Sequence, residues 1–223
     1  MGGGGFPIDL LLFGMIAAFL VLRLRGILGR KTGFERPAQP EAPQTPVPGI
    51  GRPAPALVVD NRPEPAVRPL PDPSTPAGAA LIQMRAVDRS FDPQHFLNGA
   101  EAAFRLIVGA FAAGDRVALR PLLGDDTYRS FEAAIAAREA AGETQRSEIK
   151  RIESLTVEEA ALSGSQAAIT LRIVSDQVAE TLGRDGRPVA GADAVAEITD
   201  IWTFERDLSQ PDPAWRLSAA RSG

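Results

Sequence analysis

The sequence predicts an α+β domain of helices packed on a curved, four-stranded antiparallel sheet, attached to a membrane by an N-terminal helix and a proline-rich tether. Three observations predict this fold class. An apolar run near the N-terminus is followed directly by basic residues, 13 of the 19 prolines fall in residues 37–76, and beyond them helical periodicity changes to strand alternation at Thr144. The chain therefore divides into a membrane anchor with its basic flank (1–36), a disordered linker (37–76) and one domain (77–223).

The first expected element is a membrane-spanning helix over residues 6–22, an apolar run whose one charged residue, Asp9, lies near its outer end. At ~1.5 Å per residue this helix is about 26 Å long, enough to cross a slightly thinned bilayer. A cleaved signal peptide, the main alternative beside a buried core helix, has its basic residues before the apolar run, whereas here they follow it. The residues expected to hold the anchor are Phe6, Leu12, Phe13, Phe19, Leu22, Arg23 and Arg25.

The order of charges also predicts the orientation. Because Lys and Arg stay on the cytoplasmic side, the basic flank places the C-terminal domain in the cytoplasm of a bacterium, as a single-pass inner-membrane protein, or in the matrix of an organelle. Residues 37–76 have proline every few positions, which denies them helical and strand hydrogen bonds. This tether reaches between about 35 Å as a coil and about 120 Å as polyproline II. A proline-rich ligand for a recognition domain is the alternative.

Composition excludes several classes of function. Residues 77–223 carry 22 acidic and 16 basic groups, and an acidic domain is a poor candidate for binding nucleic acid. The chain has no cysteine and a single histidine, His95, so the sequence predicts no disulfide, no metal site and no cofactor.

Residues 77–89 are expected to form a short amphipathic helix that joins the tether to the domain, because apolar residues recur there at helical spacing. Two interpretations stay open. The helix packs on its own domain, or it lies on a lipid surface with Leu81 and Met84 inserted and with Arg85 and Arg89 at anionic headgroups.

A longer helix follows, with Asp92 placed to cap it, Pro93 at its first position and Gly114 at its end. Two more helices are expected over residues 115–123 and from residue 125 to just before Gly142. The apolar stripes of the first and last of these helices are Phe96, Ala100, Ala103, Phe104, Ile107 and Phe111, and Tyr128, Phe131 and Ile135.

Strand alternation begins at Thr144. The longest alternating run, residues 195–208, places Trp202 and Phe204 on one face and is expected to be a central strand of the sheet. The other expected strands are residues 147–158, 166–178 and 214–220, with a turn at 183–186. Helices followed by a meander predict that the helices cover the concave face of a bent sheet. This layout resembles the cone-like fold of the nuclear transport factor 2-like superfamily.

Four segments then occur in a specific order: residues 91–97 (FDPQHFL), 103–115 (AFRLIVGAFAAGD), 119–123 (LRPLL) and 199–206 (TDIWTFER). Together they resemble the Tim44-like domain proteins, the bacterial relatives of the mitochondrial inner-membrane import adaptor. The resemblance covers roughly residues 77–223. It implies a large apolar pocket between helices and sheet, contact with anionic lipid such as cardiolipin, and an adaptor role with a protein partner, in protein transport or membrane-lipid homeostasis.

The candidates for chemistry are His95, Tyr128, Asp176 and Asp200. Asp200 is singled out among them, because the alternation that buries Trp202 also points Asp200 inward. A carboxylate in an apolar interior has a raised pKa unless it is paired. Asp200 therefore pairs with a basic residue on a neighbouring strand, for example Arg172 or Arg216, or transfers protons, or is turned to solvent by strand curvature. No nucleophile motif or phosphate loop accompanies it. The chain is therefore interpreted first as a non-enzymatic membrane adaptor, second as a protein with a pocket for a hydrophobic ligand or lipid, and third as an enzyme using Asp200. The expected pocket residues are Phe96, Phe104, Ile107, Phe131, Leu171, Asp200, Trp202 and Phe204.

Overall fold

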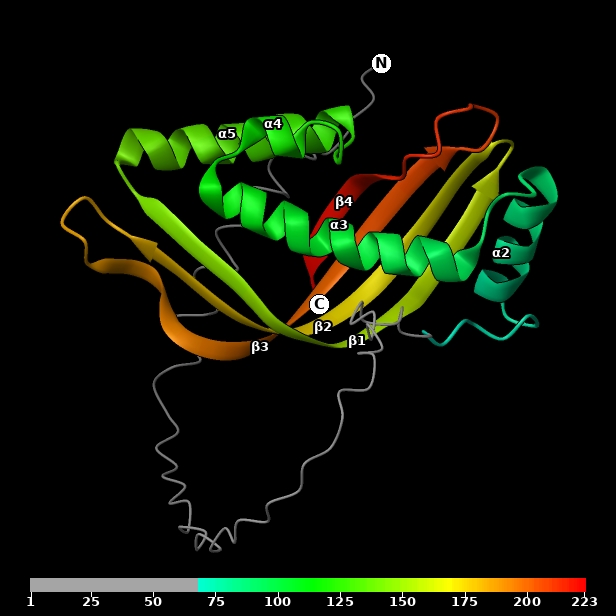
Figure 1. Ribbon diagram of the computed structural model, residues 1–223, viewed down its shortest axis with the longest axis horizontal. Helices are drawn as coiled ribbons and strands as arrows, with labels where there is room; N and C mark the ends of the chain where they lie inside the picture. The colour runs from blue at the N-terminus through cyan, green and yellow to red at the C-terminus, as the bar shows by residue number, and fades with distance from the viewer. Residues whose placement is uncertain (1–67) are drawn as a thin grey trace, which may run out of the picture.

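The computed structural model describes residues 68–223, so the expected anchor, from Phe6 to Arg25, and the linker up to residue 67 lie outside the described residues (Figure 1). Within residues 68–223, four helices precede four strands. They are α2 (Pro76–Val87), α3 (Pro93–Ala113), α4 (Arg116–Leu119), α5 (Asp125–Ala141), β1 (Thr144–Ser163), β2 (Gln166–Leu182), β3 (Pro188–Asp207) and β4 (Arg216–Ser222). The strands form one antiparallel sheet in the order β1-β2-β3-β4, and α3, α4 and α5 lie over one of its faces (Figure 1). The predicted α+β class and the helices-then-meander order are confirmed.

Helix ends follow the local sequence closely. The Asp92 carboxylate caps α3 by accepting a hydrogen bond from the backbone N–H of His95 at 2.9 Å, and Pro93 occupies the first helical position. Gly114 ends α3 in the left-handed region, with φ of 72°, where a residue without Cβ is least strained. The helix boundaries predicted from these residues are confirmed.

The apolar stripe of α3 forms the centre of the core. The Phe104 ring lies 4.6 Å from the Trp202 indole, edge to face, and the Phe96 ring lies 6.1 Å from the Phe204 ring. By length and composition alone α3 could cross a membrane, and it is the one such helix in residues 68–223. Because Phe96, Phe104 and Ile107 are buried against the sheet, α3 is the core helix of this domain.

β3 is a central strand, as predicted, because it pairs with β2 on one side and with β4 on the other. It begins at Pro188, earlier than the alternation indicated. Gln177 pairs with Ala196 but Ala179 pairs with Ala192, so residues 193–195 of β3 lie opposite the single residue Val178 and form a bulge with two extra residues. Figure 1 shows β3 curving strongly there, which turns the end of the β2–β3 hairpin toward the helices.

Within this hairpin end, Gly191 lies in the left-handed region with φ of 73°. A Cβ atom at this position would lie 2.1 Å from the backbone oxygen of Ala179, so only glycine permits this close approach of the two strands. The curved end of the sheet therefore depends on the bulge and on this glycine.

The linking helix α2 packs beside β1, with Leu81 and Met84 in the core. Of the two interpretations of this helix, packing on its own domain is the one that fits Leu81 and Met84, and insertion of these two side chains into lipid is wrong, because a side chain that fills the core cannot also contact a membrane. Arg85 and Arg89 are exposed, and the apolar side chains on the surface of this segment are Ile82 and Val87, 57% and 51% exposed.

The last residues of the expected linker lie against α3. The Gln94 side chain accepts a hydrogen bond from the backbone N–H of Arg68 at 3.0 Å and donates one to the backbone oxygen of Arg68 at 2.5 Å. The Arg68 guanidinium also pairs with Glu101. These contacts hold the chain on the domain from residue 68 onward.

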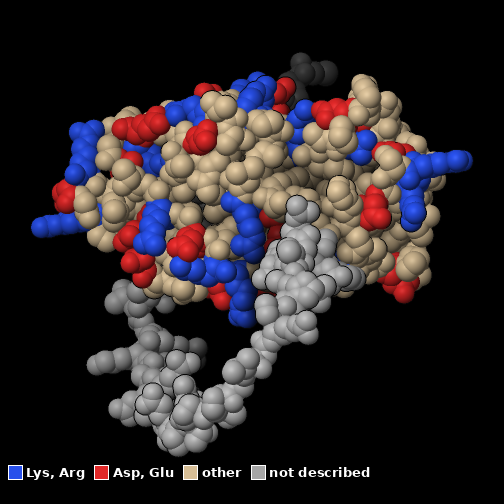
Figure 2. All heavy atoms as spheres, in the orientation of Figure 1, with Lys and Arg blue, Asp and Glu red and all other residues tan. Residues whose placement is uncertain are grey.

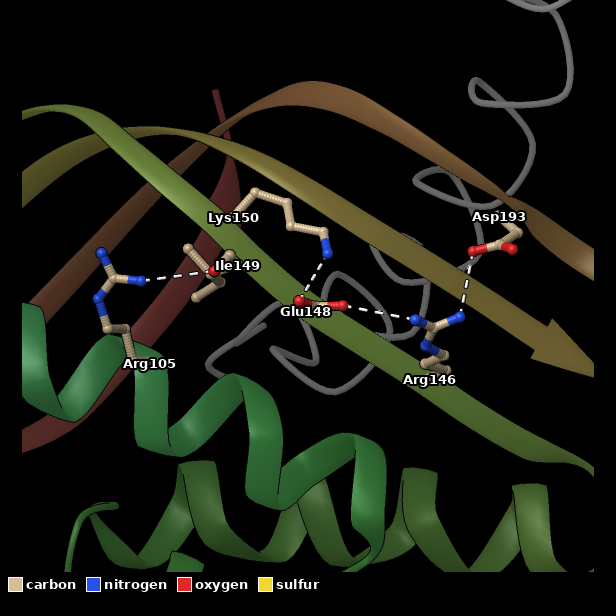
Figure 3. Close-up of polar contacts among 6 residues, drawn as sticks. All are labelled: Arg105, Arg146, Glu148, Ile149, Lys150 and Asp193. Carbon is tan, nitrogen blue, oxygen red and sulfur yellow. Dashed lines mark hydrogen bonds and ion pairs between the residues drawn. The ribbon is translucent and has the colours of Figure 1, made fainter. Parts of the chain in front are cut away.

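β1 is an edge strand, paired among the described residues with β2 alone. In the first half of β1, side chains of alternating charge stand at every second position. Glu148 pairs with Lys150 at 2.6 Å and with Arg146 at 3.4 Å, and Arg146 also pairs with Asp193 at 3.1 Å (Figure 3). Charged side chains along an edge hinder its pairing with other strands. Figure 2 shows basic and acidic side chains interspersed over this side of the molecule.

Candidate functional site

A pocket of about 570 Å³ lies between α3, α5 and the curved half of the sheet. Its inner wall is formed by buried residues, among them Ile107, Gln177 and Trp202, whereas Ala137 and Val189 on the rim are exposed. Thr181, Val189 and Ala190 reach the pocket from the end of the β2–β3 hairpin. The end of the β2–β3 hairpin therefore supplies one wall of the pocket.

Arg138 holds the helical side of the pocket together. Its guanidinium, on α5, donates hydrogen bonds to the backbone oxygens of Phe111 at 2.8 Å and Ala112 at 3.1 Å, at the end of α3, and it also bonds Gln145 on β1. It stacks on the Phe111 ring at 5.3 Å, and Phe111 in turn lies 4.9 Å from Phe131. Burial lowers the pKa of Arg138 from its usual value.

The sheet side of the pocket turns polar in one place. The inward-facing row of β2 is apolar up to Ile173 and then continues with Ser175 and Gln177, which are buried. The Gln177 amide donates hydrogen bonds to the Ser175 hydroxyl at 2.9 Å and to the Asp200 carboxylate on β3 at 3.1 Å. We call Ser175, Gln177 and Asp200 the polar corner.

Burial raises the pKa of Asp200 from 3.8 to about 6, although hydrogen bonds from Gln177 and Trp202 act in the opposite direction. Within residues 68–223 no basic side chain forms an ion pair with this carboxylate. Arg172 pairs instead with Glu158 at 3.6 Å, and Arg216 with Asp212 at 2.9 Å. The expected ion pair of Asp200 is therefore wrong.

The strand register explains this error. Arg172 lies opposite Ile201, and Arg216 opposite Glu205, so both alternate with the row that contains Trp202 and Asp200. Because successive residues of a strand point to opposite faces, both arginines face away from the pocket.

Comparison with protein families matches the Tim44-like domain over residues 77–222. The chain belongs to the Tim44-like domain family. The resemblance seen in the sequence is thus confirmed, and the Tim44-like domain coincides with the helices and sheet described above.

Solved structures with a similar fold include the intermembrane space region of the chloroplast protein ARC6, with 14% identity, 59% of this chain and 96% of that chain covered, and a TM-score of 0.43. A putative dehydratase of the NTF2-like family from Streptomyces avermitilis has 14% identity and a TM-score of 0.34, with 59% of this chain and 96% of that chain covered. A conserved protein from Planctomyces limnophilus has 18% identity and a TM-score of 0.33, with 54% of this chain and 89% of that chain covered. No curated protein matches the sequence.

In this Tim44-like domain the expected pocket residues fall into two sets. Ile107, Phe131, Asp200 and Trp202 line the pocket. Phe96, Phe104, Leu171 and Phe204 do not line it and instead fill the solid core beside it. Alternation indicates which face of a strand is inward, but the placement of the helices decides which part of that face stays uncovered.

Sequence reasoning missed Ser175 and Gln177. Their positions continue the alternation of Ile169, Leu171 and Ile173, so two polar residues at inward positions could have indicated a polar patch inside the domain. Among residues 68–223, no group of three His, Cys, Asp or Glu side chains is placed to hold a metal ion.

Proposed function

We propose that this Tim44-like protein is a membrane-anchored, non-enzymatic binding protein, and that its pocket holds an apolar ligand or lipid. The observation that carries the proposal is the pocket itself. Its volume of about 570 Å³ lies within the ~300–1,000 Å³ of small-molecule sites, and its walls include Ile107, Phe111, Phe131 and Trp202. The family is linked to membrane-associated adaptor or binding roles, which supports the same proposal.

A pocket-filling substitution tests the ligand. Ala134 lines the pocket from α5, so Ala134→Trp is expected to fill the space that a ligand occupies. The full chain in lipid nanodiscs should release an apolar small molecule on unfolding, as seen by mass spectrometry, and Ala134→Trp should abolish that release. Ala133→Trp, on the exposed side of the same helix, should leave the release unchanged. Equal release from both variants, or none from the wild type, would refute the ligand.

Catalysis by Asp200 has one observation in its favour, because a carboxyl group with a pKa of about 6 suits proton transfer near neutral pH. General acid–base chemistry also needs groups that stabilise the charge formed on the substrate. Asp200 is hydrogen-bonded to Gln177, and no second titratable side chain of residues 68–223 bonds to it. We therefore propose binding, with an adaptor role toward a protein partner, rather than catalysis.

The proposed location is the cytoplasmic face of a bacterial inner membrane. It is supported by the apolar run at 6–22 and the basic residues that follow it. The full chain is expected to stay with membranes after carbonate extraction. Protease should cleave the domain in inverted vesicles and leave it intact in spheroplasts. Release by carbonate would overturn the anchor, and cleavage in spheroplasts would overturn the orientation.

Contact with anionic lipid is proposed through the exposed surface of α2 and the residues after it, which carries Ile82, Val87, Arg85 and Arg89. Because each arginine near an anionic surface contributes ~1 kcal/mol, Arg85→Glu with Arg89→Glu should weaken binding of residues 68–223 to cardiolipin-containing vesicles at least about tenfold at low salt.

The matched control for the lipid test is Arg120→Glu with Arg129→Glu. These arginines are also exposed but lie beside and on α5. Vesicle sedimentation should show little change for this control. An equal loss in both double variants would mean that net charge alone is sensed, and no loss in either would mean that this surface of α2 does not contact lipid.

A further inference from the structure

The polar corner presents hydrogen-bond acceptors to the pocket. An ionised carboxylate only accepts hydrogen bonds, so Gln177 must present its amide N–H groups to Asp200. Both of these N–H groups are used, one on Asp200 and one on Ser175. Ser175 is fully buried and does not line the pocket, so the groups left for a ligand are the Gln177 amide oxygen and the carboxylate of Asp200, and both are acceptors.

The corner also carries a negative charge without a cation. The charged side chains that line the pocket besides Asp200 are Arg138 on α5, Glu143 before β1 and Arg221 on β4. Arg138 is committed to two backbone oxygens and to a glutamine side chain. Arg221 is exposed on the rim and forms no ion pair among the described residues. Neither arginine forms an ion pair with Asp200 in the structure, so this carboxylate is left for the cation of a ligand.

We propose that the polar corner binds the ammonium group of an amphiphilic primary amine, whose apolar body packs against Trp202 and Phe131. A primary ammonium has three donors and no acceptor, which complements a site made of acceptors and one negative charge. The inference rests on the proposed function, because it names the chemical class of ligand for the same pocket.

The test uses the full chain in lipid nanodiscs with Trp215→Phe, so that Trp202 is the remaining one of the two tryptophans and its emission reports on the pocket. Three probes share one phenylbutyl body: 4-phenylbutylamine, 4-phenylbutanol and 5-phenylpentanoate. At neutral pH the amine is expected to bind about tenfold more tightly than the alcohol, because a hydrogen bond to a charged group is stronger than a neutral one. The carboxylate probe should bind most weakly.

Asp200→Asn should bring the amine and the alcohol to within about twofold of each other. The matched control is Asp193→Asn, which removes the same charge from the same strand but at an exposed site, where Asp193 pairs with Arg146 (Figure 3). It should keep the amine preference.

If the alcohol binds as tightly as the amine, or if Asp200→Asn keeps the preference, the ammonium site is wrong while the apolar pocket stands. If none of the three probes changes Trp202 emission, the proposed pocket function fails together with this inference. A loss of preference in Asp193→Asn as well would mean that the charge of the whole domain, and not the polar corner, selects the amine.

Discussion

Arg206→Ala is expected to lower the free energy of unfolding of residues 68–223 by about 3 kcal/mol. Arg206, on β3, pairs with Asp88 at 3.0 Å, and the two side chains are only 10% and 13% exposed. The Arg206 guanidinium also donates a hydrogen bond to the backbone oxygen of Asp212 at 3.1 Å. Asp88 is the C-cap of α2, so this pair ties the α2–α3 junction to the sheet. Removing the arginine leaves a carboxylate largely buried without its cation.

Urea denaturation measures this effect, with Arg216→Ala as the control. Arg216 pairs with Asp212 at 2.9 Å, but both side chains are about half exposed, and solvent screens such a pair. The control should therefore cost less than about 1 kcal/mol. If Arg206→Ala costs no more than Arg216→Ala, the pair with Asp88 acts as an ordinary surface ion pair.

Asp200→Asn is expected to raise the free energy of unfolding by about 2 kcal/mol at about pH 8. The pKa of Asp200 rises from 3.8 in the unfolded chain to about 6 in the folded domain, so the folded state holds the proton more tightly. Since a tenfold change in proton affinity is worth ~1.4 kcal/mol, ionised Asp200 costs the folded state at most about 3 kcal/mol. Part of the side chain reaches solvent, and this lowers the expected gain.

The pH dependence follows from the direction of this pKa change. Because the folded pKa is the higher one, the cost of Asp200 is absent below pH 3.8, grows between 3.8 and about 6, and is fully present above about 6. The gain from Asp200→Asn should therefore vanish at about pH 4 and be largest at neutral and basic pH. Denaturation curves of both chains across this range measure it.

A loss of stability in Asp200→Asn at about pH 8 would contradict this reading of the site. It would mean that the folded domain stabilises the ionised carboxylate, as an ion pair would. The expected gain would instead mean that ionised Asp200 destabilises the folded domain. Such a cost is common for groups that serve binding rather than folding.

The secondary structure could be predicted from the sequence because its signals act over a few residues. Asp92, Pro93 and Gly114 set the ends of α3 through one hydrogen bond, one fixed φ and one left-handed φ. The alternation around Trp202 identified the inward face of β3, and the length of that run indicated its central place in the sheet. Family membership also followed from short segments in order.

The curved end of the sheet could not be predicted in the same way. Residues 188–194 lack the alternation of a strand, and they join β3 because Gly191 lets the chain approach β2 closely and because residues 193–195 bulge. This curvature arises from a mismatch in length between two paired strands, which neither strand shows alone.

The sequence by itself therefore determined the helices, the strands, their inward faces and the inward carboxylate of Asp200. Only the tertiary structure decided that Phe96, Phe104, Leu171 and Phe204 fill the core while Ile107, Phe131 and Trp202 line a pocket. It also decided that Asp200 meets Gln177 rather than an arginine. The reason is that sequence periodicity shows only the face on which a side chain lies. A pocket exists where the packed helices and strands leave space between side chains that point to the same interior.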